Sequence, residues 1–255
     1  MPNNLLIALS SQTALQRELD VISNNIANLN TTGYKSDNSA FSEYLMPTAR
    51  AEQFAPADRR LSFVEDRATW HDFGQGPLQQ TGSPLDVAID GDGFLVVQTP
   101  RGERYTRNGS LQINNVGELV TNAGDRVLSE SGPIVLQTTD RDIVVNPDGT
   151  IKVREGLSLN SDSTRGKLRL VNFANPQSLQ KDGTSMFAAP AGIQAQPDQK
   201  SRIVQGAIEK SNVRAVVEMA RMIQVTRHYT EVANIIQQQS DLRRAAIQQL
   251  AEVPA

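Results

Sequence analysis

The chain has 255 residues, enough for one large domain or two modest ones. Leu, Ile, Val and Phe make up about a quarter of it, above the ~20% below which disorder is the expectation. A net charge of −3 and a pI near 5.5 argue against a nucleic-acid-binding protein. The chain contains no run of about 18 apolar residues, so no membrane-spanning helix is predicted. Without cysteine no disulfide can form, and the start MPNNLLIALSSQ lacks the basic region of a signal peptide, so we expect no cleaved leader.

The first predicted element is a long helix from Leu5 to about Asn30. Apolar residues recur along it in steps of four and three, which is the spacing of a helix that packs one face against a partner helix. This assembly seam consists of Leu15, Leu19, Ile22, Ile26 and Leu29. Gly33 follows the helix, where a left-handed C-terminal cap favours glycine.

Residues 36–76 follow no lasting period and contain Pro47 and Pro56. They predict an extended connector with short strands at most. Residues 77–204 contain short β-branched runs between turn residues, which predicts a central, mostly antiparallel β domain of sandwich or barrel-like form. The clearest runs are Asp86–Ile89, Phe94–Gln98, Asp142–Val145 and Leu168–Phe173.

A second helix is predicted from about Val213, with Ser211 or Asn212 as its N-cap. Its seam is weaker, because Thr226, Ser240 and Arg243 interrupt it. The seam residues that we select on this helix are Met222, Tyr229, Ala233, Ile236 and Ile247. Neither helix can bury its seam alone. The predicted fold is therefore α+β, with residues 1–35 and 205–255 paired as a discontinuous coiled-coil assembly domain that brackets the β domain.

The end of the first helix carries amides instead of charges. From Val21 to Tyr34 there is no Asp, Glu, Lys or Arg, although exposed helix faces are normally rich in them. Asn24 and Asn28 lie opposite the seam at 100° per residue, and Asn25 flanks it. Amides without charges suit a second buried contact in which donors and acceptors are paired. Alternatively, asparagine near a helix end serves only as a cap.

The second helix repeats this pattern in the uncharged segment from Val232 to Ser240. The predicted subunit interface comprises Asn24, Asn25, Asn28, Gly33, Tyr34 and Gln237.

Three segments resemble the flagellar rod and hook protein family. NNIANLNTTGYK is similar to the N-terminal signature of that family, with Tyr34 where phenylalanine is common. DVAIDGDGFLVVQTPRGERYTRNGSLQINNVGELVTNAGDRVL resembles its β core, and EKSNVRAVVEMARMIQVTRHYTEVANIIQ its C-terminal helix. The segments occur in family order and span nearly the whole chain. The start NNLLIALSSQTALQRELDVISNNIAN is similar to that of the proximal rod members. Distal rod members, the alternative, have a longer insertion than the 38 residues that separate Lys35 from Gly74 here.

The resemblance implies a structural subunit of the basal-body rod, the periplasmic drive shaft between membrane ring and hook. Such subunits leave the cell through the flagellar type III export apparatus without a cleaved signal peptide. They polymerise helically with themselves and other rod proteins. Their terminal helices form an inner coiled-coil tube and their β domain an outer layer. It implies no enzymatic activity, cofactor, nucleic acid, membrane insertion or small-molecule substrate.

Two other classes of protein remain to be weighed against a rod subunit. Asp90 and Asp92 could serve a carbohydrate-active enzyme, but Asp-Gly-Asp-Gly is typical of a turn. They do not fit an EF-hand calcium loop, because Phe94 occupies its third acidic position. His71 and His228 are isolated and there is no cysteine, which argues against zinc. On periodicity alone, an adhesin-like coiled-coil and β protein is also possible.

Overall fold

The computed structural model describes the backbone of residues 2–45, 62–155 and 162–251, and the side chains of residues 8–39, 69–155 and 162–249. The chain divides into two compact units. The helical unit comprises Met1–Ile26, Asp37–Trp70 and Arg214–Ala255, and the β unit comprises Ala27–Ser36 and His71–Val213. The β unit therefore takes in residues just after the first helix and just before the second.

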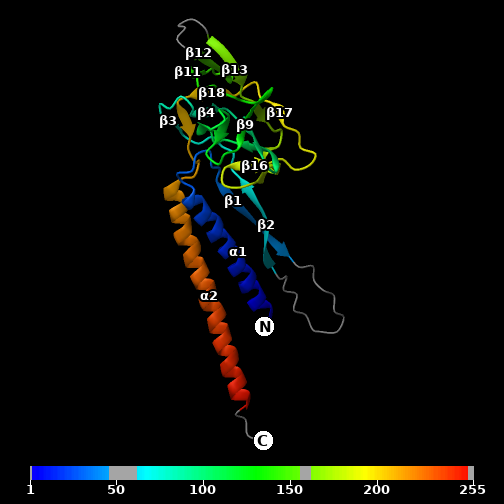
Figure 1. Ribbon diagram of the computed structural model, residues 1–255. Helices are drawn as coiled ribbons and strands as arrows, with labels where there is room; N and C mark the ends of the chain where they lie inside the picture. The colour runs from blue at the N-terminus through cyan, green and yellow to red at the C-terminus, as the bar shows by residue number, and fades with distance from the viewer. Residues whose placement is uncertain (1, 46–61, 156–161, 252–255) are drawn as a thin grey trace. The chain divides into compact units, whose positions relative to one another are not determined.

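The helical unit is built on α1 (Pro2–Ala27) and α2 (Ala215–Ala251), which run side by side (Figure 1). Gln12 donates to the Tyr229 hydroxyl at 3.1 Å, and Arg221 Nε donates to Glu18 at 2.9 Å. Because the position on α2 decreases as that on α1 increases, the two helices are antiparallel. No helix in the described ranges is long and apolar enough to cross a membrane.

Both predicted helices are present, but the predicted caps are wrong. α1 ends at Ala27, six residues before Gly33, so this glycine does not cap it. α2 begins at Ala215, and the Asn212 side chain instead binds the backbone of Ser36 and Asp72.

The segment predicted as a connector contains two long strands, β1 (Asp37–Leu45) and β2 (Ser62–His71), which form a two-stranded sheet. The expectation of short strands at most is wrong there. Pro47 and Pro56 lie outside the described residues.

Short antiparallel strands make up the β unit. They are β3 (Leu78–Gln80), β4 (Val87–Asp90), β5 (Phe94–Thr99), β6 (Gly102–Thr106), β7 (Leu111–Ile113), β8 (Leu119–Thr121), β9 (Arg126–Ser129), β10 (Gly132–Pro133), β11 (Asp140–Val145), β12 (Thr150–Glu155), β13 (Asp162–Lys167), β14 (Leu170–Asn172), β15 (Gln180–Lys181), β16 (Met186–Ala188), β17 (Gln196–Pro197), β18 (Arg202–Gln205) and β19 (Ala207–Glu209). A short 3₁₀ helix, η1 (Pro176–Ser178), lies between β14 and β15.

The main sheet has the order β15-β16-β6-β5-β9-β8-β7, with β10 paired to β9, β14 to β5, and β17 to β14. A three-stranded sheet has the order β11-β12-β13, and β4 pairs with β18 and β3 with β19. The α+β class and the mostly antiparallel β domain are thus confirmed. Each of the four clearest predicted runs overlaps a strand, namely β4, β5, β11 and β14.

Strand β5 is central because both of its faces are buried. Successive side chains on a strand point to opposite faces. Leu95 and Val97 belong to one apolar cluster with the β11 and β12 residues, whereas Phe94 and Val96 belong to a second, aromatic cluster with Phe187. The sequence FLVV is therefore apolar without alternation.

We expect acid to weaken the β11–β12–β13 sheet through Asp140, whose carboxylate accepts two hydrogen bonds from Arg165, at 2.8 and 2.6 Å. These bonds hold the pKa of Asp140 below its ordinary value of 3.8. A lowered folded-state pKa contributes stability above the unfolded value, which is lost as the pH falls through the folded value. Asp140→Asn should cost about 1–2 kcal/mol at neutral pH, and the difference from wild type should shrink below pH ~4 in urea unfolding.

Asp142→Asn is the matched control, because the Asp142–Arg154 pair is exposed and Asn tolerates the left-handed backbone of this position (φ 47°). It should change stability little at any pH. Equal losses in both variants would contradict the role of Asp140.

Candidate functional site: the helix-pair faces and a buried charge cluster

The residues selected for the seam on α1 are buried to different extents. Ile22 is completely buried, and Leu15, Leu19 and Ile26 are partly buried. Leu29 is also partly buried but follows the end of α1 and belongs to the β unit.

On α2 the seam lies one residue away from the predicted position at its centre. Val225 is the residue buried there, with 5% of its surface exposed. Thr226, which the spacing had placed in the seam, is exposed, and its hydroxyl donates to the carbonyl of Met222 within the helix. The selected residues Met222, Tyr229, Ala233 and Ile236 are partly buried. Ile247 is 60% exposed, so the described chain does not cover it.

A second apolar face runs along the first turns of α2. Val216, Met219 and Ile223 are 79%, 48% and 56% exposed. Val216 lies nine residues before Val225, which at 100° per residue places it on the opposite side of the helix. Exposed apolar surface of this kind marks a site of interaction with other proteins.

The amide residues of the predicted subunit interface differ in burial: some are exposed, and others are buried within the chain. Asn24 and Gln237 are exposed. Asn25 is completely buried. Its side chain donates to the Asp37 carbonyl at 2.8 Å and accepts from the Asp37 N–H at 2.9 Å, and it lies 3.4 Å from Glu218. Asn25 thus pairs with the start of β1 as a neighbouring strand would.

The turn after α1 lies inside the β unit. Tyr34 is completely buried, with Lys181 Nζ 4.1 Å from its ring centroid. Gly33 has φ +67°, and a Cβ there would lie 2.4 Å from Asn108 N. A side chain at Gly33 would therefore be strained and would collide with backbone. Asn28 is partly buried and accepts a hydrogen bond from the Thr31 hydroxyl.

Three charged side chains meet in the interior of the β unit. Lys35 Nζ lies 2.6 Å from Glu209 Oε1, and Arg107 Nη1 lies 3.4 Å from Glu209 Oε2. The side chains of Lys35 and Glu209 are 0% exposed and that of Arg107 is 1% exposed. Two cations thus share one buried carboxylate. We call these three residues the charge cluster.

Backbone groups complete the charge cluster. Lys35 also donates to the Gly74 carbonyl at 2.8 Å, and Arg107 to the Gly91 carbonyl at 2.7 Å. The Gly76 N–H donates to Glu209 Oε1 at 2.8 Å. Buried charges are tolerated only when paired and hydrogen-bonded in this way.

Burial dominates the electrostatics of the charge cluster. Desolvation lowers the pKa of Lys35, an effect that Glu209 opposes and the neighbouring Arg107 reinforces. Desolvation also lowers the pKa of Arg107, opposed by Glu209 and by Asp92. Glu209 is therefore the group that most opposes the lowering of the pKa at both cations.

The sequence reasoning missed the charge cluster, although it had quoted each member within a family-like segment. Lys35 ends NTTGYK, Arg107 follows the strand of YTRNGS and Glu209 begins EKSNV. Strand β6 ends at Thr106, and Arg107 follows it directly. The local sequence gives no sign that this arginine points inward.

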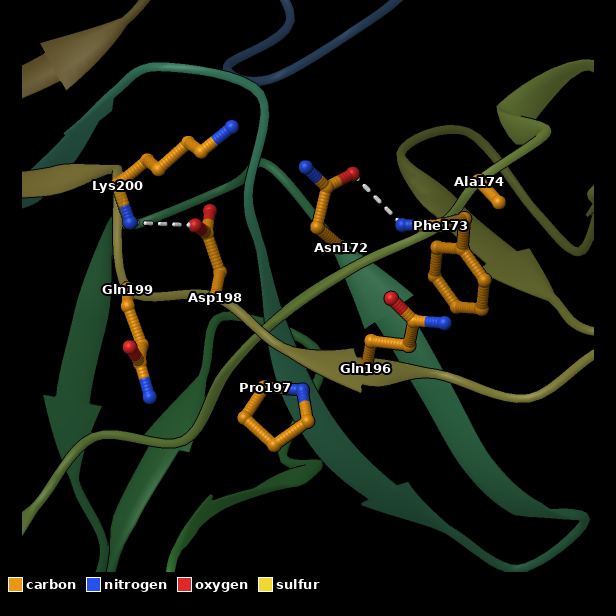
Figure 2. Close-up of a pocket in the computed structure, with 8 residues that line it drawn as sticks. All are labelled: Asn172, Phe173, Ala174, Gln196, Pro197, Asp198, Gln199 and Lys200. Atoms are coloured by element: carbon orange, nitrogen blue, oxygen red, sulfur yellow. Dashed lines mark hydrogen bonds between the residues drawn. The ribbon is translucent and has the colours of Figure 1, made fainter.

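A surface hollow of about 320 Å³ lies where β14 and β17 end, lined by residues 172–174 and 196–200 (Figure 2). Its polar groups serve the local backbone. Asp198 accepts from the Lys200 N–H at 2.8 Å and from Ser201, and Asn172 accepts from the Phe173 N–H at 2.6 Å. Although partial burial raises the pKa of Asp198, these hydrogen bonds lower it overall. Asp198 is thus an ionised turn residue.

The acidic residues weighed for catalysis lie on the protein surface. Asp90 and Asp92 are exposed, at the turn between β4 and β5. In the part of the chain that the structure describes, no three His, Cys, Asp or Glu side chains are grouped to hold a metal ion.

The charge cluster predicts unequal effects of removing its members. Glu209→Gln leaves two buried cations without a carboxylate, which should cost about 3–5 kcal/mol in unfolding free energy. Lys35→Met leaves one cation paired with one anion and should cost about 1–2 kcal/mol, from lost hydrogen bonds. Urea unfolding of the full chain measures both. Equal losses, or a larger loss for Lys35→Met, would show that charge balance does not govern this site.

Comparison with known proteins places these features in one family. Three family profiles match the chain: "Flagella basal body rod protein" at residues 5–35, "Flagellar hook protein FlgE/F/G D1 domain" at 88–153 and "Flagellar basal body rod FlgEFG protein C-terminal" at 204–249. The flagellar basal-body rod protein FlgF of Caulobacter vibrioides is 35% identical over 99% of this chain and 100% of its own length. FlgF of Mesorhizobium japonicum is 31% identical over 98% of each chain, and the rod protein FlgG of Borreliella burgdorferi is 33% identical over 93% and 94%. One residue of the charge cluster lies within each of the three matched ranges. The chain belongs to the flagellar basal-body rod protein family, as a structural rod subunit most like FlgF.

Proposed function

We propose that this protein is the proximal rod subunit, which polymerises helically in the periplasm as part of the drive shaft between the membrane ring and the hook. The observation that carries the proposal is the length of the match. The FlgF relatives align over 98–99% of this chain, whereas the FlgG relatives align over 89–93% at similar identity. A distal rod position is the second candidate, supported by that similar identity.

The assembly domain in this proposal is built from both termini, residues 1–35 with 205–255, as an antiparallel coiled coil. The bonds between α1 and α2 support the pairing. The exposed Val216, Met219 and Ile223 support a role beyond it, because a helix with apolar residues on two sides needs a second partner. We infer that this second partner is a neighbouring rod subunit, and that Asn24 and Gln237 belong to the same contact.

The proposal includes secretion by the flagellar type III export apparatus without a cleaved signal peptide. It includes no enzymatic activity, cofactor, nucleic acid, membrane insertion or small-molecule substrate. The relatives are named as rod proteins, which supports a structural role in place of catalysis.

Complementation of a deletion strain tests the position in the rod. The wild-type gene should restore swimming, and the protein should be found in purified basal bodies. Basal bodies of the deletion strain should lack the distal rod proteins if this subunit precedes them. Their presence in those particles would contradict the proximal position.

The revised seam can be tested with two adjacent residues of α2. Val225→Asp places a carboxylate in the buried face, where an unpaired charge costs several kcal/mol, so the variant should not enter basal bodies. Thr226→Asp places the same group on the exposed side and should assemble. Immunoblots of basal bodies and of the culture medium separate assembly from export. Assembly of Val225→Asp at the wild-type level would mean that the helices do not need to pair.

The proposed contact between subunits can be tested at two exposed amide residues, Asn24 and Gln237. Asn24→Glu together with Gln237→Glu should leave the monomer stable but put charges into the proposed contact between subunits, and motility should fall at least tenfold. Asn24→Gln with Gln237→Asn keeps the amides and is the control. Normal swimming of the charged variant would mean that both residues stay exposed to solvent in the assembled rod.

A further inference from the structure

The division into units gives the chain four points at which it passes from one unit to the other. They lie between Ile26 and Ala27, Ser36 and Asp37, Trp70 and His71, and Val213 and Arg214. Any force between the units that is carried by the chain must pass through these four peptide segments. How firmly their ends are held within the β unit then determines how they share that force.

Within the β unit, three of these ends are closed into a ring of hydrogen bonds. The Ser36 N–H donates to the Asn212 side-chain oxygen at 2.8 Å, the Asn212 amide donates to the Asp72 carbonyl at 2.8 Å, and the Asp72 N–H donates to the Ser36 carbonyl at 2.9 Å. Ser36, Asp72 and Asn212 each lie within two residues of a crossing. One asparagine side chain therefore joins segments that are 140 and 176 residues apart from it in sequence.

The charge cluster, which is buried, bonds the same three segments to one another. Lys35 adjoins Ser36, and it binds the Gly74 carbonyl and Glu209. Glu209 in turn accepts from the Gly76 N–H, and its carbonyl accepts from the Gly33 N–H at 2.8 Å. The Gly33 bond also holds the turn that follows the crossing between Ile26 and Ala27. Three of the four chain ends are thus tied together by buried or partly buried bonds, and the turn that follows the remaining end is anchored at Gly33.

We propose that Asn212 and the charge cluster form a clamp that makes three of the four crossings act as one stiff unit, so that twist passes between the β unit and the helical unit under load. This inference rests on the proposed function, because load arises only in a rotating rod. The residues of the clamp are positioning residues. Separate crossings would bend one at a time, whereas crossings that are bonded to one another must deform together.

Amide hydrogen exchange of the full-length protein tests the clamp independently of the rod. Asn212→Ala removes the ring, and Lys35→Met removes the inner tie. In Asn212→Ala the Ser36 and Asp72 amides should exchange at least tenfold faster, and in Lys35→Met the Gly76 amide should do so, while the Leu95 and Val97 amides keep their wild-type rates. Unchanged exchange at the crossings would overturn the clamp.

Asn114→Ala is the matched control. Its side chain also bridges backbone, accepting from Val116 and Glu118 in the turn between β7 and β8, but it lies far from every crossing in sequence. It should accelerate exchange only at those two amides.

Rotation under load tests the transmission of twist. Cells that carry Asn212→Ala should assemble basal bodies and swim normally in dilute medium, but fall at least twofold behind Asn114→Ala in viscous medium or with a tethered bead. Equal behaviour at every load would overturn the role in transmission, as would failure of Asn212→Ala alone to assemble. If the wild-type protein itself were missing from basal bodies, the proposed function would fail, while the exchange measurement would still decide whether the clamp exists.

Discussion

The buried carboxylate of Glu209 is the interaction on which the β unit depends. Lys35 and Arg107 bring two positive charges into an interior where either alone would be strongly destabilising, and this single carboxylate pairs with both. The three residues lie 72 and 102 positions apart, so none can be buried until all three segments are in place. The β unit consequently includes the turn after α1 and the segment before α2. Those termini complete its interior as well as providing helices.

The helical unit is under a different constraint, since its two helices offer more apolar surface than they can cover for each other. Ile22 and Val225 are removed from water within the chain, but Val216, Met219, Ile223 and Leu242 are not. The uncovered residues on α2 give a driving force for association. In the β unit, by contrast, the two apolar clusters on either side of β5 are buried within the chain.

The sequence predicted those features that depend on local periodicity. Both helices, the mostly antiparallel β region and the positions of β4, β5, β11 and β14 follow from spacing and turn residues, and the family followed from three motifs. Features that depend on distant partners were missed. The seam of α2 was misplaced at Thr226, because a spacing of three or four leaves the choice between neighbours open until α1 is present. Likewise, nothing local distinguishes Arg107 and Glu209 from surface charges, since only their partners make burial tolerable.

The uncharged end of α1 illustrates why a pattern can identify a requirement without identifying the partner. Amides in place of charges indicated a dry contact, and Asn25 lies in one, completely buried against the backbone of Asp37. A lysine or glutamate there could not both donate to a carbonyl and accept from an N–H, which an amide side chain does with two adjacent atoms. Asn25 is therefore required within the subunit, for holding the start of β1 to α1. Asn24, one residue earlier in α1, is exposed, so the same uncharged segment places one amide inside the subunit and another on its surface.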